Sequence, residues 1–229
     1  MGIFVYKFGR NVDVDAAEDI WAEGGTYSFP TTAQATTIRS ANAADTSTGA
    51  GARTVTIAGL DSNYMSISET VALNGTTNVT CTNQFLRINR SNVATAGTGG
   101  TNTGILRIYH GATVLGHIRA GDGQTLQTQY TVPANYKQGY IKAWNADVAT
   151  KLSTGATMVL MAREFGGAWR VRDIFGITEA APGRNEYGEH KAIIFPAKTD
   201  VKIRAAAVAA GNTDIAAGFI MELEALQNN

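Results

Sequence analysis

The sequence predicts an all-β protein built as a β-sandwich or jelly roll. Three observations lead to this fold class. Thr, Ala and the 25 Gly residues dominate the composition, whereas Leu, Lys and Glu, which favour helices, are scarce. Apolar and polar residues alternate with a period of two in many short segments. Turn-forming sequences recur roughly every ten residues, which is the spacing typical of sandwiches.

The overall composition excludes several classes of protein. The chain has 229 residues, of which 44% are hydrophobic, so it is not intrinsically disordered. Lys+Arg and Asp+Glu each number 19, and this neutral balance disfavours nucleic acid as a partner. We expect no membrane span and no secretion signal, because no apolar run approaches the required length. The single cysteine, Cys81, excludes an internal disulfide.

The first segment, residues 1–33, is expected to be an extended N-terminal arm. It combines acidic residues with isolated large side chains and fits neither a helix nor a run of strands. Burial of one large apolar side chain contributes roughly 1.5–3 kcal/mol, so several could bind this segment to a neighbouring protein. The alternative is that the arm packs on its own body. The candidate partner-contact residues are Phe4, Tyr6, Phe8, Asp13, Asp15, Trp21, Tyr27 and Phe29.

Residues 34–95 are predicted to form a smaller N-terminal domain, a β-meander. The expected strands are 35–40, 53–60, 64–73, 76–82 and 85–90. Asn74–Gly75 lies between two alternating segments and predicts a type I′ hairpin turn.

Residues 96–104, rich in Gly, Thr and Asn, have no periodicity and are predicted to be a linker. Residues 105–229 then form a larger jelly-roll-like domain. Its expected strands are 105–110, 113–119, 124–132, 140–147, 156–165, 169–177, 192–195, 200–209 and 215–226. The polar stretch 178–190 interrupts this series as a long loop.

The residues that could carry chemistry form no convincing active site. His110 and His117 flank a tight turn, but a third metal ligand is not evident. A loop cluster of Glu186, Glu189 and His190 has no helix to fix its spacing. We therefore expect no enzyme activity, no cofactor and no metal. Cys81 has no base nearby in sequence and is expected to be inert.

A resemblance to structural proteins of tailed bacteriophages becomes visible in the opening residues. The stretches 6–15 (YKFGRNVDVD), 18–21 (EDIW) and 24–33 (GGTYSFPTTA) are similar to that family. A less specific likeness to the same family is found in residues 121–126, 130–133, 198–205 and 217–219. The likeness therefore spans nearly the whole chain. Val12 stands where the family pattern leads us to expect proline.

The resemblance implies a virion protein that is made in the cytoplasm of the bacterial host. A decoration or cement protein on the outer capsid surface is the favoured position, with the major capsid protein as partner. A tail adaptor or fibre-associated β module is the first alternative. A carbohydrate-binding or small hydrolytic β-sandwich module is the second. Strands with few lysines are poorly protected as free edges, so a homo-oligomer is also expected.

Overall fold

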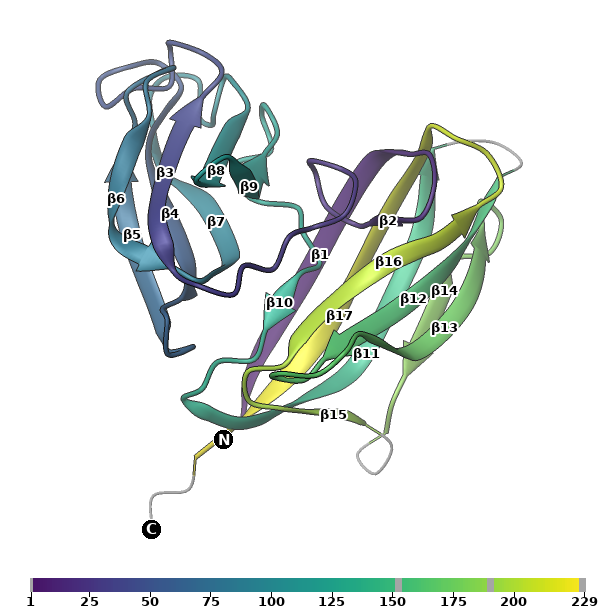
Figure 1. Ribbon diagram of the computed structural model, residues 1–229. Helices are drawn as coiled ribbons and strands as arrows, with labels where there is room; N and C mark the ends of the chain where they lie inside the picture. The colour runs from purple at the N-terminus through teal and green to yellow at the C-terminus, as the bar shows by residue number, and fades with distance from the viewer. Residues whose placement is uncertain (1, 151–153, 189–191, 227–229) are drawn as a thin grey trace. The chain divides into compact units, whose positions relative to one another are not determined.

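The computed structural model describes residues 2–150, 154–188 and 192–226, and this part of the chain contains seventeen β-strands and no helix. The predicted all-β class is confirmed. The described residues accordingly include no helix long and apolar enough to cross a membrane. The strands form two compact units (Figure 1). Unit 1 comprises the residues up to Tyr27 and those from Gln127 onward, and unit 2 comprises Ser28–Leu126.

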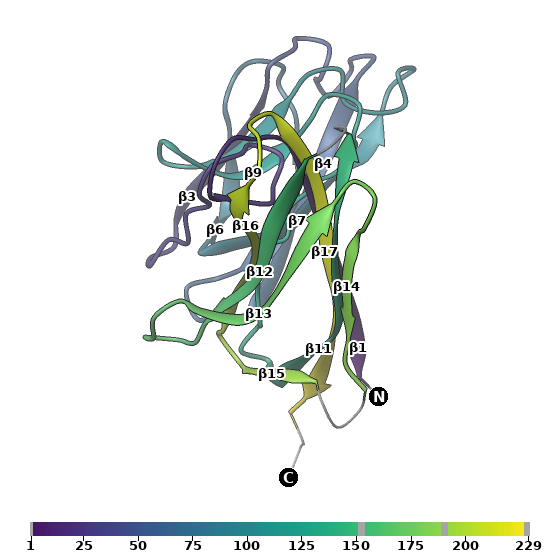
Figure 2. The same cartoon turned by 90° about the vertical axis from the view of Figure 1, so that its right-hand side faces the viewer.

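Unit 1 is a sandwich of two five-stranded antiparallel sheets. The first sheet has the order β1 (Ile3–Val14), β17 (Thr213–Ala225), β11 (Tyr136–Thr150) and β14 (Gly183–Glu186), and β15 (Ile193–Pro196) also pairs with β11. The second has the order β10 (Tyr130–Thr131), β16 (Asp200–Val208), β12 (Gly155–Arg163) and β13 (Arg170–Thr178), and β2 (Glu18–Asp19) also pairs with β16. Figure 2 shows β13 of the second sheet beside β14 of the first.

One hydrophobic core joins the two sheets of unit 1. It draws alternate residues from β11 and β17 in the first sheet and from β12 and β16 in the second. Trp144 of β11 is fully buried, and its ring stacks on Phe175 of β13 with the centroids 4.0 Å apart. The period-two alternation in these strands therefore corresponds to the inward face of a real sandwich.

Unit 2 is a smaller sandwich of seven strands. Its four-stranded sheet has the order β6 (Val79–Phe85), β3 (Gln34–Ser40), β8 (Leu106–His110) and β9 (Thr113–Ile118). Its three-stranded sheet has the order β5 (Ser66–Ala72), β4 (Ala52–Leu60) and β7 (Arg87–Ala96). Ile38, Ile57, Phe85 and Ile108 are among its fully buried side chains. The predicted meander is wrong, because β3 pairs with β6 and β8 rather than with its sequence neighbour β4.

The prediction that residues 1–33 form an extended arm that packs on a neighbouring protein is also wrong. β1 pairs with β17 along ten register positions, from Ile3 opposite Leu223 to Val14 opposite Thr213. Val14 and Ile20 belong to the core of unit 1. Residues 2–27 are therefore part of a folded unit, and the alternative that they pack on their own body is the correct one.

The predicted domain boundary at residues 96–104 is a third correction. This segment is the connection between β7 and β8 inside unit 2, where the Gly97 and Gly99 amides donate to the carbonyls of Gly51 and Ala50, both at 2.8 Å. The carboxylate of Asp45 also accepts from the Thr103 and Gly104 amides. Its many glycines permit close backbone packing rather than flexibility.

The Asn74–Gly75 turn does not close a hairpin. β5 before it and β6 after it belong to different sheets. Gly75 has a positive φ of 58°, but Asn74 is not among the residues with positive φ, so a type I′ turn is not formed. Gly75 instead accepts from the Ser40 amide at 3.0 Å and donates to the Asp45 carbonyl at 2.8 Å. The turn thus carries the chain from one sheet to the other.

Candidate interaction surface

The most prominent exposed apolar feature of unit 1 lies on β1, the last strand of its sheet. From Phe4 to Val12 every second residue faces outward, and the exposed fractions are 51% for Phe4, 58% for Tyr6, 41% for Phe8 and 38% for Val12. We call these four residues the β1 face. Large apolar side chains in a row on a terminal strand are typical of surfaces that contact another protein.

The opposite side of β1 has an unusual composition for a covered strand face. It carries Val5, Lys7, Gly9 and Asn11, of which Lys7 and Asn11 are buried. A Cβ atom at Gly9 would lie 2.6 Å from the Ile20 carbonyl oxygen, so only glycine fits beneath that segment. The polarity of the middle of β1 is therefore inverted, with Tyr6 and Phe8 outside and Lys7 and Asn11 inside, whereas Val5 and Val14 face the core.

Ion pairs flank the β1 face. Arg10, which follows Phe8 on the same side of the strand, donates from Nε to the Asp214 carboxylate at 2.8 Å. Near the other end, Glu222 lies opposite Phe4 and pairs with Lys142 at 2.8 Å. Between them, Gly218 lies opposite Phe8 and Ile220 lies opposite Tyr6. An apolar centre with a charged rim is the usual anatomy of a protein–protein interface.

The structure does not bring the eight predicted contact residues together. Phe4, Tyr6 and Phe8 share the β1 face, whereas Trp21 and Tyr27 are buried in unit 1, where their rings meet edge to face at 4.9 Å. Phe29 belongs to unit 2, and the Arg87 guanidinium lies 5.4 Å from its ring centre. Asp13 and Asp15 are exposed, and Asp15 accepts from the Asn212 amide at 2.8 Å. Val12 belongs to the exposed row but was missed by sequence reasoning.

The acidic residue that secures this region is Asp19, which the sequence alone did not distinguish from its neighbours. It is fully buried and accepts hydrogen bonds from Lys202 at 2.9 Å, Arg204 at 3.1 Å and the Tyr27 amide at 2.8 Å. Burial lowers the pKa of Lys202, and the charge of Asp19 offsets part of this effect. The network joins residues 18–27 to β16.

The described histidines and the cysteine that were considered for metal binding or nucleophilic chemistry are buried within unit 2. His110 and His117 are both buried in unit 2, and burial, followed by the charge of Arg87, lowers the pKa of His110. Within the described ranges no three His, Cys, Asp or Glu residues are grouped for a metal ion. Glu186 is described, but Glu189 and His190 lie outside the described residues. Burial and the nearby Glu69 raise the pKa of Cys81 to about 12.

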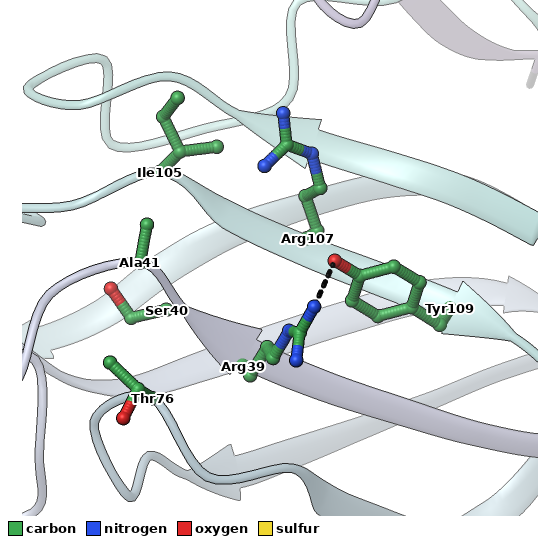
Figure 3. A pocket seen from close by; sticks show the side chains of 7 residues that line it. All are labelled: Arg39, Ser40, Ala41, Thr76, Ile105, Arg107 and Tyr109. Atoms are coloured by element: carbon green, nitrogen blue, oxygen red, sulfur yellow. Dashed lines mark hydrogen bonds between the residues drawn. The ribbon is translucent and has the colours of Figure 1, made fainter. Parts of the chain in front are cut away.

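A hollow of about 200 Å³ lies on unit 2 beside β3 and β8 (Figure 3). Its lining residues are Arg39, Ser40, Ala41, Thr76, Ile105, Arg107 and Tyr109. The Arg39 guanidinium lies 5.2 Å from the centre of the Tyr109 ring, and its Nη2 donates to the phenol oxygen at 3.4 Å. Sequence reasoning missed this site, because its residues come from three separate segments.

No family model and no curated protein matches this sequence. Among solved structures, the chain aligns with the structure of the Gt strain of infectious bursal disease virus at 10% identity, a TM-score of 0.28, and coverage of 98% of this chain and 72% of that one. The VP2 subviral particle of infectious bursal disease virus aligns at 7% identity and a TM-score of 0.13, covering 99% of this chain and 82% of that one. The function is therefore argued from the chain's own residues.

Proposed function

We propose that this chain is a non-enzymatic structural protein of a bacteriophage virion, and that it binds the outer surface of the head as a decoration or cement protein. The observation that carries the proposal is the β1 face, an exposed row of Phe4, Tyr6, Phe8 and Val12 on a terminal strand. Its partner is the major capsid protein. The resemblance of residues 6–15, 18–21 and 24–33 to phage structural proteins supports the virion setting.

The arrangement of polar groups supports a role in contact rather than catalysis. The only thiol, that of Cys81, is buried, and its raised pKa makes it a poor nucleophile. The carboxylates of Asp19 and Asp45 are fully buried, and both accept several hydrogen bonds from the fold itself. These groups stabilise the two units, and the exposed apolar row of β1 is the feature that we propose contacts a partner.

The test is binding to the particle. Purified protein is added to empty heads and to isolated tails of its own phage, and bound protein is measured by sedimentation. We expect saturable binding to heads, and loss of that binding in the triple variant F4S/Y6S/F8S. These side chains are exposed, so the variant should keep its fold, which circular dichroism checks.

A matched control replaces exposed apolar residues at the opposite side of unit 1. Val171 and Ile174 of β13 are 53% and 57% exposed, and V171S/I174S should bind heads like the wild type. Binding to tails alone would establish the tail-module alternative instead. Equal loss of binding in both variants, or unchanged binding in the triple variant, would contradict a role for the β1 face.

A further inference from the structure

The outer face of the first sheet of unit 1 extends beyond β1. Residues directly opposite each other in antiparallel strands point to the same side of a sheet. Phe4 of β1 lies opposite Glu222 of β17, and Glu222 lies opposite Tyr140 of β11. Tyr140 in turn lies opposite Ile194 of β15, which is 47% exposed. The exposed Phe4 and Ile194 therefore belong to one face, at the two ends of a row across β1, β17, β11 and β15.

Tyr140 and Ile220 add apolar surface to the interior of this face. In the next row Tyr6 lies opposite Ile220, which is partly exposed, as Tyr140 is. Gln138 Nε2 donates to the Tyr140 hydroxyl group, which donates to the Glu224 carboxylate. The Tyr140 ring is thus held in place before any partner binds, which lowers the entropic cost of contact. We call the following residues the sheet face: Phe4, Tyr6, Phe8, Tyr140, Ile194 and Ile220.

The charged side chains around the sheet face are paired with one another. The Lys142 ammonium lies 2.8 Å from the Glu222 carboxylate, and Arg10 Nε donates to the Asp214 carboxylate at 2.8 Å. Two further pairs on this face are Lys137–Glu224 and Arg184–Glu186. Asp147 lies outside these pairs, in the row of Arg10 and away from Phe4. Within the described residues, the rim of the sheet face therefore offers little net charge to a partner.

This nearly neutral rim restricts the kind of surface that can cover the sheet face. A charged group of a partner would lose its water without meeting an unpaired countercharge, which costs free energy. Electrostatic steering also needs a net potential, which paired charges do not provide. An apolar, uncharged surface has little hydration to lose, and it gains from the burial of the exposed aromatic and aliphatic side chains.

We propose that the sheet face binds an apolar, uncharged surface of the major capsid protein, and that Tyr140 and Ile194 are contact residues together with the β1 face. The inference rests on the proposed attachment to the head, and it adds the chemistry of the surface that is bound. The contact covers β1, β17, β11 and β15 rather than one terminal strand. Burial of apolar surface, and not charge, then holds the protein on the head.

The first test introduces a charge of either sign at one position. I194E and I194K are added to empty heads, and bound protein is measured by sedimentation. Either charge loses its water against an apolar surface, so both variants should lower the affinity at least about tenfold, and to a similar extent. The matched controls are I174E and I174K, which change a 57% exposed isoleucine of β13 in the other sheet and should bind like the wild type. Circular dichroism checks that each variant is folded.

The second test is the salt dependence of wild-type binding. Salt screens attraction between unlike charges on two partners, but it does not weaken the burial of apolar surface. The affinity for heads should therefore change by less than about twofold between 0.1 and 0.5 M NaCl. A loss of tenfold or more over this range would show that the bound surface is charged.

Other results would also overturn the inference. If one of I194E and I194K binds like the wild type or more tightly, the partner surface carries the opposite charge. If both bind like the wild type while F4S/Y6S/F8S does not, the contact ends at β1, and the proposed function stands without this inference. A wild-type dimer in sedimentation velocity that both Ile194 variants disrupt would show that a second copy covers the face. Failure of the wild type to bind heads would contradict the proposed function, and this inference with it.

Discussion

Asp45 shows how one buried carboxylate can organise several loops at once. It is fully buried and accepts hydrogen bonds from the Ser40 hydroxyl at 2.6 Å and from the amides of Ala52, Thr103 and Gly104, each at 2.8 Å. Ser40 and Ala52 flank Asp45 in the sequence, whereas Thr103 and Gly104 belong to the distant connection between β7 and β8. A buried charge is tolerated only when its hydrogen-bonding capacity is filled, as it is here.

The first prediction concerns this residue. Asp45→Ala leaves four donors without their acceptor, and we expect it to lower the free energy of unfolding by about 3 kcal/mol or more. Urea denaturation followed by circular dichroism measures the change. Asp122→Ala is the control, since Asp122 is exposed on the same unit and should change stability by no more than about 0.5 kcal/mol. Similar midpoints for the two variants would contradict the assigned role of Asp45.

The second prediction follows from the environment of Cys81. Burial, and then the charge of Glu69, raise the pKa of its thiol to about 12, against about 8.5 for a free cysteine. At pH 8 the folded protein therefore holds on the order of one thiolate in 10⁴. Ellman's reagent should react slowly with the native protein and quickly after unfolding in urea. The native rate should rise as the pH is raised above 8. Rapid reaction of the native protein at pH 8 would show that the thiol is accessible and unperturbed.

At the scale of elements, the composition of β1 explains why residues 1–33 were predicted to be an arm and not part of a sheet. A covered strand is recognised by apolar residues on its inner face, but β1 carries Lys7, Gly9 and Asn11 there and its aromatic residues outside. Its partner β17 lies at the other end of the chain, and no local signal predicts that pairing. By contrast, segments with ordinary polarity, such as 53–60 and 200–209, were predicted close to the observed β4 and β16.

The third prediction is that β1 is required for unit 1 to fold. Deletion of residues 1–14 removes its whole ladder with β17 and the Arg10–Asp214 ion pair. It also exposes the core around Ile215 and Phe219. We expect loss of the cooperative thermal transition of unit 1 and rapid trypsin cleavage of residues beyond 127. The F4S/Y6S/F8S variant, which keeps the strand and changes only its outer face, should retain the transition. A stable truncated protein would show that β1 is an accessory strand.

At the scale of the whole molecule, unit 2 is inserted between Tyr27 and Gln127 of unit 1. Sequence reasoning predicted two β domains but placed the boundary at a glycine-rich loop, because composition marks loops and not the pairings of distant strands. The candidate site was predicted only in part. Phe4, Tyr6 and Phe8 were predicted as contact residues and are exposed. Trp21 and Tyr27 were predicted in the same way because they are also aromatic, but they are buried. The row from Phe4 to Ile194 depends on registers among β1, β17, β11 and β15 that the sequence does not display.

The fourth prediction tests this division. A fragment of residues 28–126 contains both sheets of unit 2 and should unfold cooperatively with a β-type circular dichroism spectrum. A fragment of residues 105–229, the C-terminal domain expected from the sequence, lacks β1 and separates β8 from its partner β3. It should aggregate or remain unfolded. A folded 105–229 fragment together with an unfolded 28–126 fragment would instead support a domain boundary at residues 96–104.

The antiparallel pairing of β1 with β17 has a mechanical consequence. Ile3 lies opposite Leu223, so a load applied across these two residues opens the ladder from that end. The hydrogen bonds then break one pair after another rather than all together in shear, which requires little force. The chain leaves unit 1 after Tyr27 and returns to it at Gln127. While unit 1 stays folded, the load therefore passes between its own strands and not through unit 2. Under such a load the protein would therefore yield first at β1, and unit 2 would bear load only after β1 and β2 had detached from the rest of unit 1.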